Sequence, residues 1–169
     1  MEFMEVISKR RSIRKYKSDP IPDAEINYVL ESARLAPSWA NSQCWKFIVV
    51  KDKNVREELA KAGNNWIAHA PVIIAACADP SKPGVKNDQQ YYMLDIGISM
   101  EHIMLAAADR GLGTCWIGAF DEATAKKALG VPDGIRVVAL TPLGYPAEAP
   151  GPRPRKAMMD IVCVDKYES

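Results

Sequence analysis

The stretch KRRSIRKYK, residues 9–17, holds closely spaced side chains that could bind an anion. Three guanidinium groups, Arg10, Arg11 and Arg14, fall within five positions, and the hydroxyl of Ser12 lies between them. Arginine offers a planar fork of donors that matches the oxygens of a phosphate, whereas lysine offers a point charge. Such a run is either an ordinary solvated charged face or a cradle for one anion.

A second cationic cluster stands far along the chain, in the proline-rich segment PAEAPGPRPRK. Proline disfavours a helix or a central strand, so this segment is expected to be extended. Alternate residues of an extended chain point to the same side, which allows Arg153 and Arg155 to face one target. The net charge of the chain is only +1, yet residues 9–17 hold six of its 22 Lys and Arg. Two remote clusters on a nearly neutral protein predict convergence on one compact anion.

The motifs that bind a nucleotide through backbone amides are missing. The sequence contains neither G-x-x-x-x-G-K-[ST] nor a G-x-G-x-x-G after an expected strand, and GLGTC at 111–115 reads only as a turn. Capture of a terminal phosphate by side chains therefore fits better than capture of a pyrophosphate. A nucleic-acid binder is a further alternative, but it normally carries a larger excess of positive charge.

The elements that must position these clusters can be read from hydrophobic periodicity and from helix start and stop signals. Apolar spacing at i, i+3, i+4 and i+7 in PDAEINYVLESARLAP predicts a helix, and the uniformly apolar PVIIAACA predicts a buried strand. The helix with the longest pattern is apolar more than halfway round, so we expect it to be central to the fold or to a dimer. The helices are expected within 3–9, 22–37, 54–63, 88–111 and 121–130, and the strands within 45–51, 71–78, 114–120 and 135–145, with a possible edge strand at 160–165.

At 169 residues, this alternation predicts one α+β or α/β layered domain over residues 1–169. The apolar runs are far shorter than the roughly 20 residues of a membrane helix, and MEFMEVISKR lacks the apolar segment of a secretory signal. We therefore expect a cytoplasmic protein without membrane or nucleic-acid partners.

A polar loop between two of these elements is a further candidate for function. APSWANSQCW, residues 36–45, follows a helix and precedes a strand, and it is dense in hydrogen-bonding side chains between two indoles. Loops of this kind hold functional groups when rigid elements position them. The alternative is a connecting loop anchored by a tryptophan.

Four motifs, RRSIRKY, APSWANSQCW, GLGTCWIGAF and RPRK, occur in the order and spacing of the FMN-dependent nitroreductase family, which the chain resembles over nearly its whole length. The resemblance implies an α+β fold with a central, mixed but mainly antiparallel sheet flanked by helices, in an intertwined homodimer with FMN at the subunit interface. Cys44 departs from the family, which more often has proline there. A mid-chain flavin contact is left open between Asn64 and Asn65. The FMN-binding residues implied by position are Arg10, Arg11, Ser12, Arg14, Pro37, Ser38, Trp39, Asn41, Ile117, Gly118, Arg153 and Arg155, with residues 37–41 supplied by the other subunit.

The activity implied by the resemblance is that of an FMN-dependent oxidoreductase. It would take hydride from NADH or NADPH and reduce nitroaromatics, quinones or a related small acceptor in ping-pong turnover. The flavin N5 carries the hydride, so we expect no catalytic side chain and no metal, and Arg14 is the residue that could polarise the ring. The alternatives are an FMN-binding protein without turnover, or another flavin reaction such as dehalogenation or flavin fragmentation.

The remaining reactive side chains have simpler interpretations. The four cysteines lie far apart, and those in apolar runs, Cys77 and Cys163, are predicted to be buried and inert. His69 and His102 are predicted to be satisfied structural histidines. Asp95 is predicted to be a helix or interface hydrogen-bond partner, and Trp66 and Trp116 to be mainly core residues, either of which could border the flavin.

Overall fold

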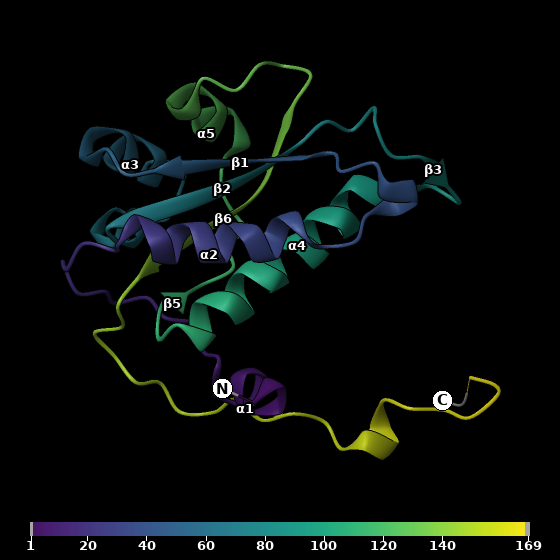
Figure 1. Cartoon of the computed structure of the whole chain (residues 1–169). Coiled ribbons are helices and arrows are strands. Elements are labelled where there is room, and N and C mark those ends of the chain that lie inside the picture. The colour runs from purple at the N-terminus through teal and green to yellow at the C-terminus, as the bar shows by residue number, and fades with distance from the viewer. Residues whose placement is uncertain (1, 168–169) are drawn as a thin grey trace.

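The computed structural model describes residues 2–167. Its centre is a four-stranded sheet, in which every pair of neighbouring strands is antiparallel. Helices cover both faces: α2 (Asp23–Arg34) and α4 (Tyr91–Asp109) lie on one, and α3 (Lys53–Ala60) and α5 (Glu122–Leu129) on the other (Figure 1). The predicted α+β class is confirmed. The strand order is β1 (Trp45–Val50), β2 (Val72–Ala78), β6 (Arg136–Gly144) and β5 (Gly113–Thr114).

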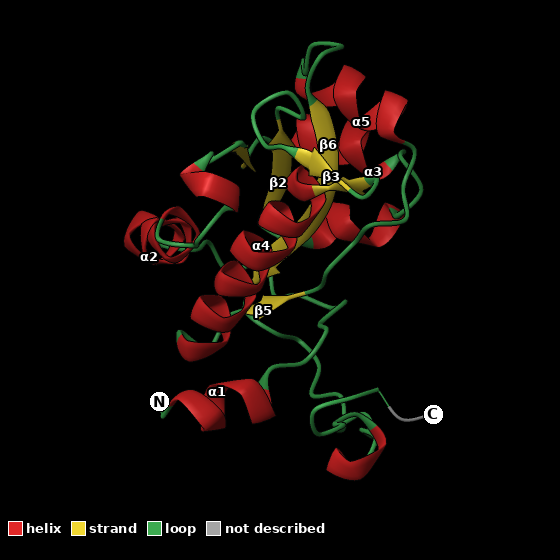
Figure 2. Cartoon of the chain, turned by 90° about the vertical axis from the view of Figure 1, so that its right-hand side faces the viewer, coloured by secondary structure: helices red, strands yellow, loops and turns green. Residues whose placement is uncertain are grey.

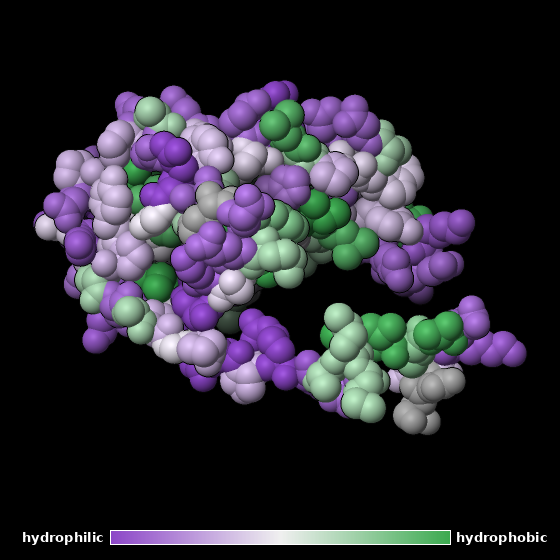
Figure 3. Space-filling view, turned by 60° about the horizontal axis from the view of Figure 1, so that its bottom comes forward, coloured by the Kyte–Doolittle hydropathy of each residue, from purple (hydrophilic) through white to green (hydrophobic). Residues whose placement is uncertain are grey.

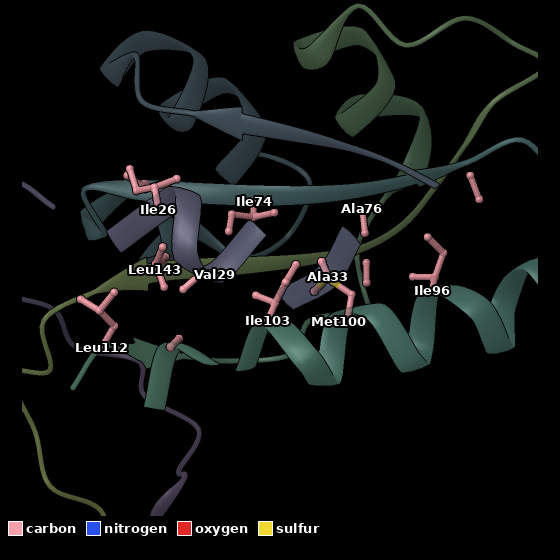
Figure 4. Close-up of a cluster of buried hydrophobic side chains, with 14 of the residues drawn as sticks. Ile26, Val29, Ala33, Ile74, Ala76, Ile96, Met100, Ile103, Leu112 and Leu143 are labelled. Atoms are coloured by element: carbon pink, nitrogen blue, oxygen red, sulfur yellow. The ribbon is translucent and has the colours of Figure 1, made fainter. Parts of the chain in front are cut away.

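The central strand β2 explains why its sequence is apolar throughout. Ile74 and Ala76 pack into the core beneath α2 and α4, whereas Ile73 and Ala75 pack into the core on the opposite face. Successive side chains of a strand point to opposite faces, so a strand covered on both sides needs apolar residues at every position. Figure 4 shows the first of these cores, closed by side chains of α2, α4 and β6.

Helix ends follow from local chemistry. Asp52 and Asp121 precede α3 and α5, and each carboxylate accepts a hydrogen bond from the backbone N–H three residues on. Gly130 ends α5 with φ of 64°, the left-handed conformation that glycine adopts without strain. The smaller elements are α1 (Phe3–Lys9), the 3-10 turns η1 (Trp39–Asn41), η2 (Asn65–His69) and η3 (Met158–Asp160), and a hairpin of β3 (Val85–Lys86) and β4 (Gln89–Gln90).

Helix α4 is central to the fold, which is one of the two alternatives that its pattern left open. Ile96, Met100 and Ile103 are fully buried against α2 and the sheet. At its N-terminal end, Met93 and Leu94 are about half exposed, so residues 2–167 leave this part of the helix uncovered. The helix therefore carries apolar side chains that are not buried in the core of the described chain.

Two expectations at the ends of the sheet are wrong. The segment 114–120, expected as a strand followed by a turn, contributes only Thr114 to β5, and beyond it Ile117 forms one isolated bridge with Leu140. The segment 160–165 adds no edge strand. It follows η3 in an exposed tail that runs away from the sheet (Figure 2).

Two classes of feature are missing from the part of the chain that the structure describes. None of the helices within residues 2–167 is long and apolar enough to cross a membrane. Over the same residues, no group of three or more His, Cys, Asp and Glu side chains has an arrangement that could hold a metal ion.

Candidate anion site and flavin loop

The N-terminal run reaches the sheet by pairing with its short edge strand. Ser12 and Thr114 form a parallel bridge, and the Ile13 N–H donates to the Thr114 carbonyl at 2.8 Å. The Ile13 side chain is buried directly over Gly113, where a Cβ atom would lie 2.8 Å from Ile13 Cγ1. The absence of a side chain at residue 113 therefore lets the run lie close to β5.

The proline-rich segment is tied to the same run by a carboxylate. Glu148 Oε1 accepts hydrogen bonds from the backbone N–H groups of Arg14 at 2.5 Å and Lys15 at 3.1 Å. The Ala147 N–H donates to the Lys15 carbonyl at 2.9 Å, which makes the pairing reciprocal. Sequence reasoning missed Glu148, although it is the one acid in PAEAPGPRPRK. Its position among cations was the available signal.

These contacts bring the two cationic clusters into the lining of one pocket of about 490 Å³. One part of the lining comes from the end of α1 and the residues that follow it, and another comes from the extended segment around residue 150. The two segments are some 140 positions apart in sequence, so only the tertiary structure brings them together. The lining is Ile7, Ser8, Arg10, Arg11, Ser12, Arg14, Glu101, Pro150, Gly151, Pro152, Arg153 and Arg155.

The arginines of this pocket form no ion pair with a carboxylate of the described residues. Among residues 2–167, none of its five arginines has a carboxylate oxygen within 4.0 Å. Arg11 Nη1 donates to the carbonyls of Ser8 at 2.6 Å and Arg10 at 2.9 Å, so part of its guanidinium closes the end of α1. Arg155 Nη1 likewise donates to neighbouring backbone carbonyls. The pocket therefore offers several charge-assisted donors to an anion.

One acid, Glu101 of α4, also lines the pocket. Burial raises the pKa of Glu101, and the positive charges of Arg10 and His102 act in the opposite direction. A carboxylate here lowers the positive potential and repels an anion. Sequence reasoning missed this residue because nothing in the helical pattern shows which turn of α4 faces the arginines.

The polar loop at 38–44 lies near the N-terminal end of α4 and contributes nothing to this pocket. The buried carboxylate of Asp95 holds it, accepting a hydrogen bond from the Trp39 N–H at 2.8 Å. The prediction of Asp95 as a hydrogen-bond partner is confirmed. Within one chain, Pro37, Ser38, Trp39 and Asn41 are therefore separate from the arginines that line the anion pocket.

Comparison with known proteins identifies the family of the chain. The family model described as "Nitroreductase family" matches residues 7–65 and 60–145. The chain belongs to the nitroreductase family. Its members are oxidoreductases, and the predicted family is thereby confirmed.

Three similar proteins illustrate the relationship. A nitroreductase family protein of Clostridium novyi NT is 42% identical, with a TM-score of 0.85, and the match covers 88% of this chain and 87% of that one. The NADPH:FMN oxidoreductase of Vibrio harveyi, solved in complex with NAD+, is 27% identical with a TM-score of 0.90, and the match covers 99% and 78%. A protein of Thermus thermophilus named NADH dehydrogenase is 30% identical over 187 residues, with 91% of each chain covered.

The turn at 117–118, in the motif GLGTCWIGAF, follows β5. Ile117 is buried and exchanges backbone hydrogen bonds with Leu140, each 2.9 Å, whereas Gly118 is exposed. Asn64 Nδ2 donates to the Ala119 carbonyl at 2.9 Å. Of the two asparagines left open, Asn64 is therefore the one tied to this turn.

Other single-residue expectations have mixed outcomes. Cys77 is buried, but Cys163 is exposed because the expected strand around it does not form. His102 Nδ1 lies 2.9 Å from the Ser32 carbonyl, as a structural histidine should, whereas His69 is exposed. Trp66 is partly buried against the second core, but Trp116 is 39% exposed and is no core residue.

Proposed function

We propose that the chain works as a homodimeric, FMN-dependent oxidoreductase, which takes hydride from NADH or NADPH and reduces a nitroaromatic, a quinone or a related small acceptor. Family membership and relatives such as the Vibrio harveyi NADPH:FMN oxidoreductase support FMN as the cofactor and NAD(P)H as the donor. The observation that carries the proposal is the pocket in which five arginines meet without a carboxylate partner within the described chain.

The pocket residues fit the phosphate of FMN. A phosphate monoester carries close to two negative charges and three acceptor oxygens, which match several converging guanidiniums and a hydroxyl. We assign phosphate binding to Arg10, Ser12, Arg153 and Arg155. Arg11 adds charge, although part of its guanidinium is engaged by the backbone.

The chemistry that bound FMN supplies is acceptance of hydride at N5 and its onward transfer. The protein then has to orient the ring, exclude competing reactions and stabilise negative charge. Arg14 lines the pocket and is exposed, so its guanidinium is available for the last of these roles. Donor and acceptor would use the same open face of the ring in turn, which is the basis for ping-pong turnover.

The homodimer is supported by surfaces that a single chain leaves uncovered. The tail carries exposed apolar side chains, among them Met159, Ile161 and Val164, and it stands clear of the rest of the molecule (Figure 3). The uncovered part of α4 adds Met93 and Leu94. Exposed apolar side chains that gather along one segment mark an interaction site. We propose a second copy as its partner, which would also bring the 37–41 loop of one subunit to the flavin of the other.

The test begins with the purified full-length protein. Its visible spectrum, before and after addition of FMN, shows whether flavin binds, and light scattering gives its mass in solution. We expect a yellow dimer whose flavin is bleached within seconds by NADH or NADPH without oxygen and recolours with a nitroaromatic or a quinone. A protein that binds no FMN would refute the proposal, whereas bound flavin that neither donor reduces would identify a binding protein without turnover.

A pair of variants links this result to the pocket. Arg155→Ala removes a charge from its lining, and Lys156→Ala removes the same charge from the adjacent position, which does not line it. FMN retention during gel filtration should fall for Arg155→Ala and remain at the wild-type level for Lys156→Ala. Equal retention in the two variants would place the phosphate elsewhere.

A further inference from the structure

The loop that joins α2 to β1 has an unusual backbone. Ala40, Asn41 and Gln43 have φ of 45°, 56° and 46°, in the left-handed region that non-glycine residues seldom adopt. Three such residues within four positions cost conformational energy, and this conformation persists only where the surroundings impose it. Strain of this kind is concentrated at functional sites, and here it falls in a loop that resembles the flavin-contacting loop of the family.

A single buried carboxylate imposes the conformation. Asp95 is 2% exposed, and it accepts hydrogen bonds from the Trp39 N–H at 2.8 Å, the Ser42 hydroxyl at 3.2 Å and the Cys44 thiol at 3.6 Å. These three donors come from the beginning, the middle and the end of the loop. Burial, reinforced by Asp95, raises the pKa of the Cys44 thiol to about 11, so the thiol stays protonated and donates.

Packing fixes the outer part of the loop. The Trp39 ring stacks on Tyr91 with centroids 5.9 Å apart. On Gly84, before the β3–β4 hairpin, a Cβ atom would lie 2.7 Å from Trp39 Cζ2, so the indole and the Gly84 backbone are in close contact. The Ser38 hydroxyl accepts the Gln43 N–H at 3.0 Å, which closes the loop on itself. The loop is thus preorganised, while Trp39 and Asn41 remain exposed.

We propose that Asp95 is a positioning residue that holds the 38–44 loop in the conformation that contacts the flavin ring, and that the Cys44 thiol is part of this support. The inference rests on the proposed function, because the ring contact itself comes from that assignment. A carboxylate is required because it offers two acceptor oxygens and no donor, whereas an asparagine would offer one acceptor and turn an N–H₂ toward two donors.

The test compares FMN with riboflavin, which lacks the phosphate. Apo-protein of wild type and of Asp95→Asn is titrated with each flavin by fluorescence, and the reduction potential and visible bands of bound FMN are recorded. Because the loop would contact the ring and not the phosphate, Asp95→Asn should weaken binding of both flavins by the same factor, about tenfold, and shift the bands. Cys44→Ser, which keeps a donor, should bind both flavins as wild type does, and Cys44→Ala should weaken both.

Ser99→Ala is the matched control. Ser99 is fully buried on the same helix one turn further on, and its hydroxyl donates to the Ile96 carbonyl rather than to the loop. If Ser99→Ala reproduces the losses, or if Asp95→Asn leaves both affinities, the bands and the potential unchanged, Asp95 has no positioning role. Either result leaves the proposed function intact. The proposed function fails only if the wild-type protein binds no FMN, or if neither NADH nor NADPH reduces the FMN that it binds.

Discussion

Replacement of Arg10 by alanine tests the anion pocket most directly. Arg10 follows α1, is partly buried, lines the pocket and has no carboxylate within 4.0 Å in the described chain. Its positive charge opposes the rise in the pKa of Glu101, so the two side chains interact electrostatically. Arg10→Ala removes a guanidinium and leaves the backbone pairing of the run with β5 untouched.

The size of the effect follows from the type of contact. At an effective dielectric constant near 20, a unit charge about 4 Å away is worth roughly 4 kcal/mol. Salt and the remaining arginines screen a pocket that opens to solvent, so the lower scale of hydrogen bonds to charged groups, about 1.5–3 kcal/mol, applies. With about 1.4 kcal/mol for each factor of ten, the Kd for FMN should rise about 10- to 140-fold.

The assay is a fluorescence titration of apo-protein with FMN and with riboflavin at two salt concentrations. The loss for Arg10→Ala should appear with FMN and shrink at higher salt, and riboflavin affinity should stay within about twofold of wild type. The FMN affinity of Arg10→Lys should lie between those of wild type and Arg10→Ala, because lysine keeps the charge but lacks the planar fork of donors. Lys17→Ala is the matched control, since Lys17 belongs to the same run, is exposed and lies outside the pocket lining.

Two results would refute this reasoning. Equal losses for FMN and riboflavin would mean that Arg10 supports the ring or the fold and not the phosphate. Equal losses for Arg10→Ala and Lys17→Ala would mean that only the overall charge of the run matters.

Three further predictions address the acid of the pocket, the approach of the run to β5, and pH. Glu101→Gln should tighten FMN binding about fivefold in the same titration, because removal of a repelling carboxylate is worth about 1 kcal/mol at a partly exposed site; weaker binding would contradict this. Gly113→Ala should lower the free energy of unfolding by about 1–3 kcal/mol in urea, since its Cβ would overlap Ile13; wild-type stability would show that the run can move away. The hydrogen bond from Arg136, 2.9 Å long, lowers the pKa of Glu122 in the folded protein, so its contribution to stability is present above the usual glutamate pKa of about 4.3 and is lost as pH falls through the lowered value. The stability gap between wild type and Glu122→Gln should therefore close in acid, and a gap independent of pH would count against the ion pair.

Local patterns were enough to predict most of the secondary structure. The apolar residues of α2 recur at helical spacing, and β2 is apolar at every position because both of its faces are covered. An aspartate begins α5 and a glycine ends it, and both residues act on the backbone next to them. The ends of α5 could therefore be predicted from the sequence. The segment at 160–165 shows where this reasoning fails. Its alternating apolar residues suit a strand, but a strand needs a partner, and the described chain offers none at that place.

Some residues of the candidate site could likewise be predicted from the sequence, and others could not. Residue types and their spacing indicated an anion cradle, because guanidinium groups suit phosphate oxygens; its arginines are Arg10, Arg11, Arg14, Arg153 and Arg155. Glu148 was not singled out from the sequence, and Asp95 was predicted only as a helix or interface hydrogen-bond partner. Both accept hydrogen bonds from backbone N–H groups more than fifty positions away, and a backbone N–H leaves no mark in a sequence.

The sequence by itself determined most of the local structure, the two basic clusters and the family, because periodicity, capping residues and motif order depend on near neighbours along the chain. Only the tertiary structure decided that the clusters share one pocket, that Asp95 supports a strained loop, and that part of α4 and the tail remain uncovered. These features depend on contacts between segments distant in sequence, and such contacts exist only once the sheet has aligned β5, the N-terminal run and the proline-rich segment.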